Sequence, residues 1–451
     1  MSALETVVAR DGLPEITRSS ELYQRSLGLI PGHTQTLAKG PGQFVLGVAP
    51  LYLARGKGAR VTDVDGNSFL DYSMAVGPLS LGYCHPAVDA AIRAQLEDGI
   101  TFSLMHPLEV EVAELVREVV PGAESVRYSK TGADVTSAAV RLARAFTGRD
   151  KVLCCGYHGW HDWFIATTDR AAGVPDGVRE LSYTIPYNDV EAARAAIDGE
   201  TACVILEPVT FAAPAPGFLE GLRRACDAAG ALLIFDEMWT GFRLALGGAQ
   251  QRFGVRADLA CFSKAVANGM PLSMLTGRSD VMALLAHDVF FFTTFGGEAL
   301  SLAAAKATIT ELRDKDVPDH LARLGTRLRD GYNELARELG LAAATSCVGF
   351  PCRTLVSFAP EAGDPLELKS LVQQELLRQR ILWQGFHNLS FSHTDGDVDE
   401  TLLAYRSVLS TLRRALDEGS VRPRLLGAPV EAVFRRTSQF NTRPAPSGAR
   451  A

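Results

Sequence analysis

Short apolar runs alternate with amphipathic helical segments between about residues 125 and 280, and this alternation restricts the possible folds more than any other feature. The apolar runs, each expected to form a strand, are 126–128, 151–155, 203–206 and 232–235. The helical segments between them are 134–146, 190–197 and 216–229. Strands and helices that alternate in this way predict an α/β fold with a mainly parallel central sheet and helices on both faces.

The segments on either side of this region predict a smaller α+β domain. Strands are expected at 50–53, 59–63, 69–72, 353–358 and 381–383, with Asp65-Gly66 as a hairpin turn. Helices are expected at 85–96, 108–119, 299–339 with a break near Pro318, and 398–416. We therefore divide the chain into an N-terminal arm with part of the small domain (1–70), a large domain (71–300), a C-terminal small domain (301–420) and a mobile tail (421–451).

Charge and cysteine content exclude several classes of function. The net charge is −7, so no basic field for nucleic acid or an anionic membrane is expected. The eight cysteines have no C-x-x-C spacing and are expected to be free thiols, with no metal site. The first residues lack the features of a secretion signal, and no apolar run reaches the roughly 20 residues of a membrane span. The expected location is the cytoplasm.

Polar residues follow two of the apolar segments, and they are the first candidates for chemistry. Asp236 and Glu237 end the apolar run 232–235, where a buried acid is costly unless it has a partner. Lys264 lies 28 residues further on, followed by small residues that would let the chain pack closely around its amine. Taken separately, a surface acid and a solvated loop lysine explain these residues equally well.

Two turns supply further candidate groups. Residues 128–134 lead from a strand into a helix, where the free backbone N–H groups of Thr131-Gly132-Ala133 would suit a phosphate. Residues 156–162 follow the next strand and contain Tyr157, His158 and Trp160, whose rings could stack on a flat ligand or simply pack in the core. An anion cradle, an aromatic ring, a carboxylate and an amine are together what pyridoxal 5′-phosphate (PLP) uses in enzymes.

The sequence resembles the class III, fold type I PLP-dependent aminotransferases over roughly residues 30 to 415, in particular the glutamate-1-semialdehyde 2,1-aminomutase branch. The stretches that carry the resemblance are 61–66, 140–144, 147–150, 157–159, 216–219, 235–237, 240–243, 252–255, 258–259 and the segment around Lys264. The resemblance implies a homodimeric biosynthetic enzyme with shared active sites.

The resemblance also implies roles for single residues. Lys264 would be the Schiff-base lysine and proton carrier, and Asp236 would pair with the pyridine nitrogen of PLP. Tyr157 would cover the ring. The other implied cofactor contacts are Thr131, Gly132, Ala133, His158, Glu207 and, from the partner subunit, Thr294. Lys39, Trp160, Glu207, His387 and Asn388 are the expected substrate contacts.

Three departures from the aminomutase pattern favour transamination over an internal amino shift. Lys39 stands near the place where the aminomutases carry an arginine, and a lysine cannot form a two-pronged clamp. Residues 385–392 contain no acid, and Ala133 replaces a hydroxyl residue in the phosphate turn. We therefore expect a ping-pong reaction that passes through pyridoxamine 5′-phosphate.

The expected amino donor is an amino acid, and the expected acceptor is a carbonyl compound. The polar and aromatic side chains of Trp160, His161, Trp239, His387 and Asn388 suggest a keto or aldehydo sugar as that acceptor, or ordinary packing. A 1,2-aminomutase, an amino-acid epimerase and a non-catalytic PLP-binding protein remain alternatives.

Overall fold

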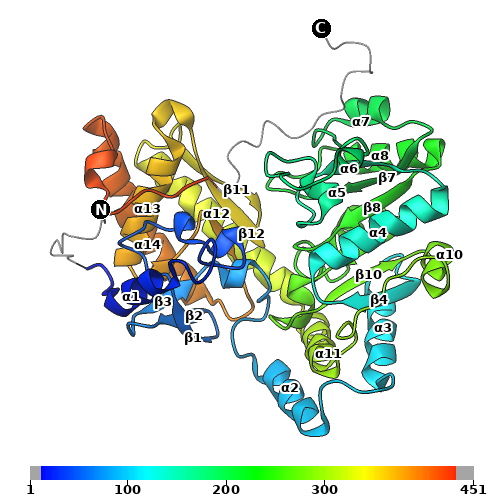
Figure 1. Ribbon diagram of the computed structural model, residues 1–451. Helices are drawn as coiled ribbons and strands as arrows, with labels where there is room; N and C mark the ends of the chain where they lie inside the picture. The colour runs from blue at the N-terminus through cyan, green and yellow to red at the C-terminus, as the bar shows by residue number, and fades with distance from the viewer. Residues whose placement is uncertain (1–11, 433–451) are drawn as a thin grey trace. The chain divides into compact units, whose positions relative to one another are not determined.

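The computed structural model describes residues 12–432, which form two compact units (Figure 1). One unit contains residues 12–85 and 319–432, and the other contains residues 86–318. No helix among the described residues has the length and apolar character that crossing a membrane requires.

The unit of residues 86–318 is built on a seven-stranded sheet in the order β4-β10-β9-β8-β7-β5-β6. Its strands are β4 (Ser125–Ser129), β5 (Lys151–Cys155), β6 (Ser182–Thr184), β7 (Thr201–Leu206), β8 (Leu232–Asp236), β9 (Leu259–Phe262) and β10 (Ser273–Gly277). Strands β9, β8, β7, β5 and β6 are parallel, which confirms the mainly parallel sheet. The strand β10 runs antiparallel to both of its neighbours, β9 and β4.

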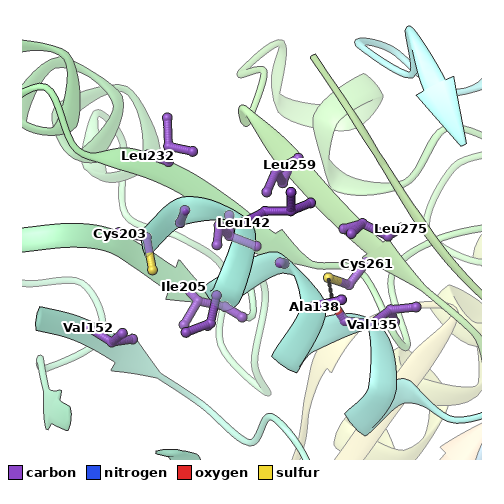
Figure 2. Close-up of a cluster of buried hydrophobic side chains, with 14 of the residues drawn as sticks. Val135, Ala138, Leu142, Val152, Cys203, Ile205, Leu232, Leu259, Cys261 and Leu275 are labelled. Carbon is purple, nitrogen blue, oxygen red and sulfur yellow. Dashed lines mark hydrogen bonds between the residues drawn. The ribbon is translucent and has the colours of Figure 1, made fainter. Parts of the chain in front are cut away.

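Helix α4 (Gly132–Thr147) covers the middle of this sheet with a face of small and branched side chains. Val135, Ala138 and Leu142 lie on that face and are fully or almost fully buried. They pack in one cluster with side chains from five strands, among them Ile205 and Leu259 (Figure 2). Alanines on the helix bring its backbone close to the sheet, and the branched strand residues fill the remaining space.

The other helices of this unit follow the alternation expected from the sequence. They are α2 (Pro86–Asp98), α3 (Pro107–Val119), α5 (Asp162–Ile165), α6 (Asp176–Arg179), α7 (Val190–Ala196), α8 (Phe218–Ala229), α9 (Gly248–Phe253), α10 (Ser279–Met282) and α11 (Ala299–Asp314). The helical stretch after residue 299 ends at Asp314, and α12 (Val317–Glu338) begins beyond Asp316, whose φ of 46° is left-handed. Pro318 therefore lies in the first turn of the new helix, where proline is tolerated.

The unit of residues 12–85 and 319–432 holds two small sheets, in the orders β1-β2-β3-β13 and β11-β12-β14. The strands are β1 (Leu53–Lys57), β2 (Arg60–Asp63), β3 (Ser68–Asp71), β11 (Thr345–Phe350), β12 (Arg353–Phe358), β13 (Ile381–Leu382) and β14 (Phe386–Asn388). The helices are α1 (Thr17–Ser26), α12, α13 (Pro365–Arg378) and α14 (Asp395–Asp417). The prediction of a strand at 50–53 is wrong in its bounds. The strand begins only at Leu53, where the chain starts to pair with β2.

The segment after α14 is tied to the N-terminal part of the chain. Leu46 and Ala428 exchange two backbone hydrogen bonds, of 3.1 and 3.0 Å, and Val430 is buried in a cluster with Val45. The expected tail 421–451 therefore begins with a packed segment, and its part from residue 433 on lies outside the described residues.

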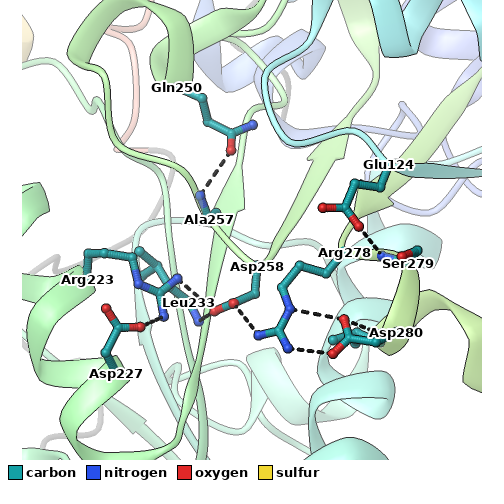
Figure 3. Close-up of polar contacts among 11 residues, drawn as sticks. Glu124, Arg223, Asp227, Leu233, Gln250, Ala257, Asp258, Arg278, Ser279 and Asp280 are labelled. Carbon is teal, nitrogen blue, oxygen red and sulfur yellow. Dashed lines mark hydrogen bonds and ion pairs between the residues drawn. The ribbon is translucent and has the colours of Figure 1, made fainter.

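A buried carboxylate joins three segments at the N-terminal ends of β8 and β9 (Figure 3). Asp258 accepts hydrogen bonds from Arg223 on α8 (2.7 Å), from Arg278 (2.8 Å) and from the backbone N–H of Leu233 (2.8 Å). The bond to Leu233 links the start of β8 to the residue that precedes β9. Because two guanidinium groups neutralise this carboxylate, it can be buried without an unpaired charge.

Replacing Asp258 by alanine is expected to lower the free energy of unfolding by about 3 kcal/mol, since two arginines lose a buried partner. Asp227→Ala is the matched control. It removes an exposed partner of the same Arg223, at 2.7 Å, and should cost less than about 1 kcal/mol. Urea unfolding followed by circular dichroism measures both effects, and equal losses would contradict the proposed importance of Asp258.

Candidate active site

The carboxyl ends of two neighbouring parallel strands bring the acid and the lysine to one edge of the sheet. Asp236 is the last residue of β8, and it pairs in register with Cys261 of β9. Lys264 follows Cys261 by three residues and lies two residues beyond Phe262, where β9 ends. Ligands of parallel α/β sheets bind outside the carboxyl ends of the strands.

Asp236 is buried and held by side-chain and backbone donors of neighbouring segments. Its Oδ1 accepts from the N–H of Met238 (3.0 Å), and its Oδ2 lies 2.8 Å from Nδ1 of His158. The other ring nitrogen, Nε2 of His158, lies 3.2 Å from the carbonyl oxygen of Cys155, which can only accept. The hydrogen bonds of His158 to Asp236 and to Cys155 can form together in two ways. Either both ring nitrogens carry a proton, or Nε2 carries one and a second proton lies between Nδ1 and the carboxyl group of Asp236. His158 is therefore the hydrogen-bond partner that allows Asp236 to be buried.

The N-terminus of α4 forms the turn in which a phosphate was expected. Thr131 caps the helix by accepting from the N–H of Asp134 (3.3 Å), and Asp134 accepts in return from the N–H of Thr131 (2.8 Å) and the hydroxyl of Ser129 (2.8 Å). Burial by itself raises the pKa of Asp134, but these hydrogen bonds outweigh it and lower the pKa below its usual value. The remaining N–H groups of the first helical turn, at Gly132 and Ala133, have no acceptor within the helix.

Two glycines let three segments approach at this turn. A Cβ at Gly132 would lie 2.8 Å from Sδ of Met238, which follows β8. A Cβ at Gly159, where φ is +107°, would lie 2.7 Å from Cβ of Ala133. The phosphate turn, the aromatic loop after β5 and the end of β8 therefore meet in one place, and side chains at either glycine would fill it.

Glu207 and Tyr157 belong to the same cluster. The carboxylate of Glu207 accepts from the N–H of Tyr157 (3.0 Å). Burial raises the pKa of Glu207, and the charge of Asp236 raises it further, while His158 and Lys264 act in the opposite direction. Burial likewise raises the pKa of Tyr157, with Asp236 and Glu207 adding to it. The ring of Tyr157 packs edge-on against Phe164, with the centroids 5.5 Å apart.

Lys264 is presented by a strained turn. Its φ is +47°, a left-handed conformation that is uncommon for a residue with a side chain. The hydroxyl of the preceding Ser263 donates to the carbonyl of Leu272 (2.7 Å) and ties the turn to the start of β10. Ala265, Val266 and Ala267 are fully buried beneath it, so the exposed lysine stands on a fixed base.

The expected substrate residues do not all lie on a surface. His387 is buried, with its ring nitrogens at 2.8 Å from the hydroxyl of Thr354 and 2.7 Å from that of Tyr405, and burial lowers its pKa to about 3. Asn388 is also buried and donates to the carbonyl of Ser73 (2.9 Å). Both side chains are buried in their unit, and their role as substrate contacts stays a prediction.

The remaining candidates are accessible, with one exception. Trp160 and Thr294 are exposed in the unit of residues 86–318, and Lys39 is exposed in the other unit. Trp239, in contrast, is buried and donates from its ring nitrogen to the carbonyl of Val209 (2.9 Å). The polar and aromatic residues that suggested a sugar acceptor are therefore mostly ordinary packing.

Sequence reasoning missed two functions in this cluster. His158 was expected beside the cofactor, but not as the hydrogen-bond partner of Asp236. Met238 was not expected to pack against the phosphate turn. A histidine 78 positions from an acid gives no sequence signal of pairing, because only the parallel sheet brings them together.

The cluster offers a matching group for each part of PLP. The N-terminus of α4 suits its phosphate, Asp236 suits a protonated ring nitrogen, Tyr157 suits the ring face and Lys264 suits the aldehyde. The glycines let the segments that carry these groups approach one another closely. Fold and cluster together define a PLP-dependent enzyme of fold type I.

Comparisons with known proteins give the family. The profile of the class III aminotransferases matches residues 46–342. The chain is 34% identical to 3-aminobutyryl-CoA aminotransferase of Cloacimonas acidaminovorans over 89% of its own length and 99% of that protein. It is 35% identical to glutamate-1-semialdehyde 2,1-aminomutase of Roseiflexus castenholzii, with coverage of 89% and 99%.

A solved structure agrees with these relatives. The FumI protein of Sphingopyxis sp. MTA144, whose structure contains PLP, is 31% identical, covers 91% of this chain and 100% of its own, and superimposes with a TM-score of 0.83. The chain belongs to the class III aminotransferase family. It is a PLP-dependent aminotransferase that moves an amino group from an amino-acid donor to a carbonyl acceptor.

Gly159→Ala is expected to weaken PLP binding at least about tenfold, because the new methyl group would push Ala133 out of the phosphate turn. Gly148→Ala is the matched control at the other end of α4. Its φ of +66° gives a similar backbone strain, but nothing lies within 4 Å of the added Cβ. Titration of the apoenzyme with PLP, followed by absorbance, measures the difference, and similar affinities for both variants would contradict the close approach.

Proposed function

We propose that Lys264 and Asp236 are the catalytic pair of this aminotransferase. The observation that carries the proposal is their placement at the carboxyl ends of the paired strands β8 and β9, with Glu207 close enough for its pKa to respond to the charges of both. An amine and a carboxylate at adjacent strand ends can act on opposite parts of one flat ligand.

Each group has a separate task in the proposed reaction. PLP, when bound, supplies an aromatic ring that accepts the electrons left behind when a substrate loses its α-proton. Asp236, braced by His158, keeps the ring nitrogen protonated. The N–H groups of Gly132 and Ala133 hold the phosphate, and Tyr157 covers the ring. The amine Nζ of Lys264 removes the proton from the α-carbon of the amino donor and returns protons in the second half of the cycle.

Transamination is favoured over the aminomutase reaction by three residues or segments. Lys39 stands near the place of the carboxylate-binding arginine of the aminomutases, Ala133 stands where the family has a hydroxyl residue, and residues 385–392 carry no acid. The aminomutase relatives at 35% identity make the internal amino shift the second candidate. A transaminase needs an added keto acid or aldehyde for each turnover, whereas a mutase does not.

Lys264→Ala should lower kcat more than about 10³-fold, in line with the loss of a general base, while PLP stays bound by its other contacts. Small primary amines added to this variant should restore part of the activity, because they can carry the same proton. Lys306→Ala, an exposed lysine of the same unit that pairs with Glu111 at 2.6 Å, is the control and should keep full activity. Appreciable turnover of Lys264→Ala without added amine would remove Lys264 from the mechanism.

We also propose a homodimer in which Thr294 reaches the active site of the partner subunit. Exposed apolar side chains flank this threonine, namely Phe290, Phe292 and Phe295. The loop that carries Leu104 and Met105, both largely exposed, lies beside them. The N–H of Ala299 donates to the carbonyl of Ile100 (2.9 Å), and a Cβ at Gly297 would approach Glu109 within 2.9 Å. An apolar patch of this kind is typical of a subunit interface.

Phe292→Asp is expected to convert the dimer to a monomer, since a charge would be buried in the interface. Leu403→Asp, which changes an even more exposed apolar residue on α14, should leave the dimer intact. Sedimentation velocity measures both.

Mixing Lys264→Ala with Thr294→Ala tests the shared site directly. Each mixed dimer would contain one site with both native residues, so activity should rise above that of either variant alone. An unchanged activity would contradict the reach of Thr294 across the interface.

The cytoplasm is the proposed location. All eight cysteines are free thiols, and seven of them are buried, as expected for a protein of a reducing compartment.

A further inference from the structure

The imidazole of His158, which pairs with Asp236, packs against the rings of two neighbouring residues of helix α5. The indole of Trp163 lies nearly parallel to it, with the centroids 6.0 Å apart and the planes at 16°. The ring of Phe164 meets it edge-on, with the centroids 5.4 Å apart. Both of these aromatic side chains are buried. The orientation of the imidazole is therefore set by packing as well as by its hydrogen bonds to Asp236 and Cys155.

The indole of Trp163 is itself fixed by a hydrogen bond to helix α4. Its Nε1–H donates to the hydroxyl of Ser137 (2.9 Å), and that hydroxyl also lies 2.6 Å from Nδ1 of His161. An indole N–H can only donate, so Ser137 is the acceptor of the first bond. The indole cannot rotate without losing this bond.

Helix α4 thereby positions two parts of the candidate site. Its first turn holds the backbone N–H groups that suit a phosphate. In the next part of the helix, the hydroxyl of Thr136 donates to the carbonyl of His158 (2.8 Å), and Ser137 follows directly. The backbone of His158 is thus tied to α4 through Thr136, and its ring is tied to α4 through Trp163 and Ser137.

Stacking on an indole favours the charged form of the pair that His158 makes with Asp236. The face of an indole carries negative charge density, which attracts a cation within about 6 Å of the ring centre. His158 is a cation when both of its ring nitrogens are protonated, which is one of the two arrangements that its hydrogen bonds allow. A cationic His158 leaves Asp236 as a carboxylate, and a carboxylate is the form that can hold a proton on a pyridine nitrogen.

We propose that Trp163 is a positioning residue, which holds His158 in the orientation and charge state that Asp236 requires. Ser137 fixes the indole for this task. The inference goes beyond the catalytic pair, and it rests on the proposed role of Asp236 toward the ring nitrogen of PLP. Trp163 acts only through His158 in this role, and not by contact with substrate or cofactor.

Filling of the core is the other explanation for Trp163, because it belongs to the same buried cluster as Val135 and Leu142. The two explanations differ in what they predict for small changes. A core residue can lose its N–H group with no effect on His158. A positioning residue cannot, because the hydrogen bond to Ser137 keeps the indole parallel to the imidazole.

The proton on Nδ1 of His158 reports the pairing with Asp236 directly. It can be followed by NMR in the full-length PLP-loaded enzyme with isotope-labelled histidine, and His158→Asn identifies the signal by its loss. Trp163→Leu removes the stacked ring and should speed the exchange of this proton with water at least about threefold, as the loss of an aromatic contact predicts. Unchanged exchange in Trp163→Leu would overturn the proposal.

Leu285→Ala is the control for a general loosening of the core. Leu285 lies in the 3₁₀ helix η5 (Ala283–Ala286) and is buried in the same cluster as Trp163. Its truncation also leaves a space in that cluster, but it removes no ring beside His158. Exchange of the His158 proton should therefore stay unchanged, and an increase equal to that of Trp163→Leu would overturn the proposal.

Ser137→Ala tests the hydrogen bond without removing a ring, and it serves where Trp163→Leu does not fold. It should speed the exchange of the His158 proton at least about twofold, as the loss of one hydrogen bond predicts. Trp163→Phe should act alike, and the double variant should add nothing, because both changes remove the same bond. Thr147→Ala, the control, removes a hydroxyl of α4 that donates to the carbonyl of Ala143 (2.7 Å). Equal exchange in Ser137→Ala, Trp163→Phe and Thr147→Ala would overturn the proposal.

Turnover of the same samples separates this inference from the proposed function. Trp163→Leu should lower kcat and leave KM unchanged, because Trp163 acts on the ring-nitrogen end of PLP and not on the substrate. Full turnover by Lys264→Ala, with faster exchange in Trp163→Leu, would overturn the proposed function alone. Loss of turnover in Lys264→Ala, with unchanged exchange in Trp163→Leu, would overturn the positioning role alone.

Discussion

The register between β8 and β9 is the constraint on which the candidate active site depends. Pairing of Asp236 with Cys261 sets where each strand stops, and therefore how close the acid and Lys264 lie. A slip by one residue would turn every side chain of one strand to the other face. At the opposite ends of the same strands, Asp258 is bonded to Leu233 and to two arginines. That network resists a slip, so an interaction far from the chemistry fixes its geometry.

The same sheet also brings a hydrogen-bond donor to the buried carboxylate of Asp236. A carboxylate buried at a strand end needs a hydrogen-bond donor beyond the edge of the sheet. For Asp236 at the end of β8, that donor comes from the loop after β5, which lies two strands away. His158 reaches Asp236 from that loop while its second nitrogen is fixed by the carbonyl of Cys155. Glu207, at the end of the strand between them, experiences the charge of both. Neighbouring strand ends thus form one electrostatic unit.

Much of the fold was predictable because local patterns determine it. The apolar run of β5 was expected with its observed bounds, and β7 and β8 differ from expectation only at their ends. The short strand β10 was not singled out, because its sequence Ser-Met-Leu-Thr-Gly has no clear period and its pairing with β4 depends on distant residues. His387 illustrates the same limit at the level of single residues. Its polarity suggested a ligand contact, but Thr354 and Tyr405 satisfy it within the core.

Two strained segments show where sequence patterns and final structure diverge most. Lys264 adopts a left-handed conformation directly after β9, and the run from Met74 to Val76 does so shortly after β3. In both places a strand has just ended, and a side-chain hydrogen bond holds the following turn, from Ser263 in one and to Asp71 in the other. Regular pairing gives the chain a fixed starting direction, and these bonds then offset the cost of an unfavourable backbone. A relaxed turn would point Lys264 and Val76 elsewhere, so the strain is best understood as the means by which each side chain is aimed.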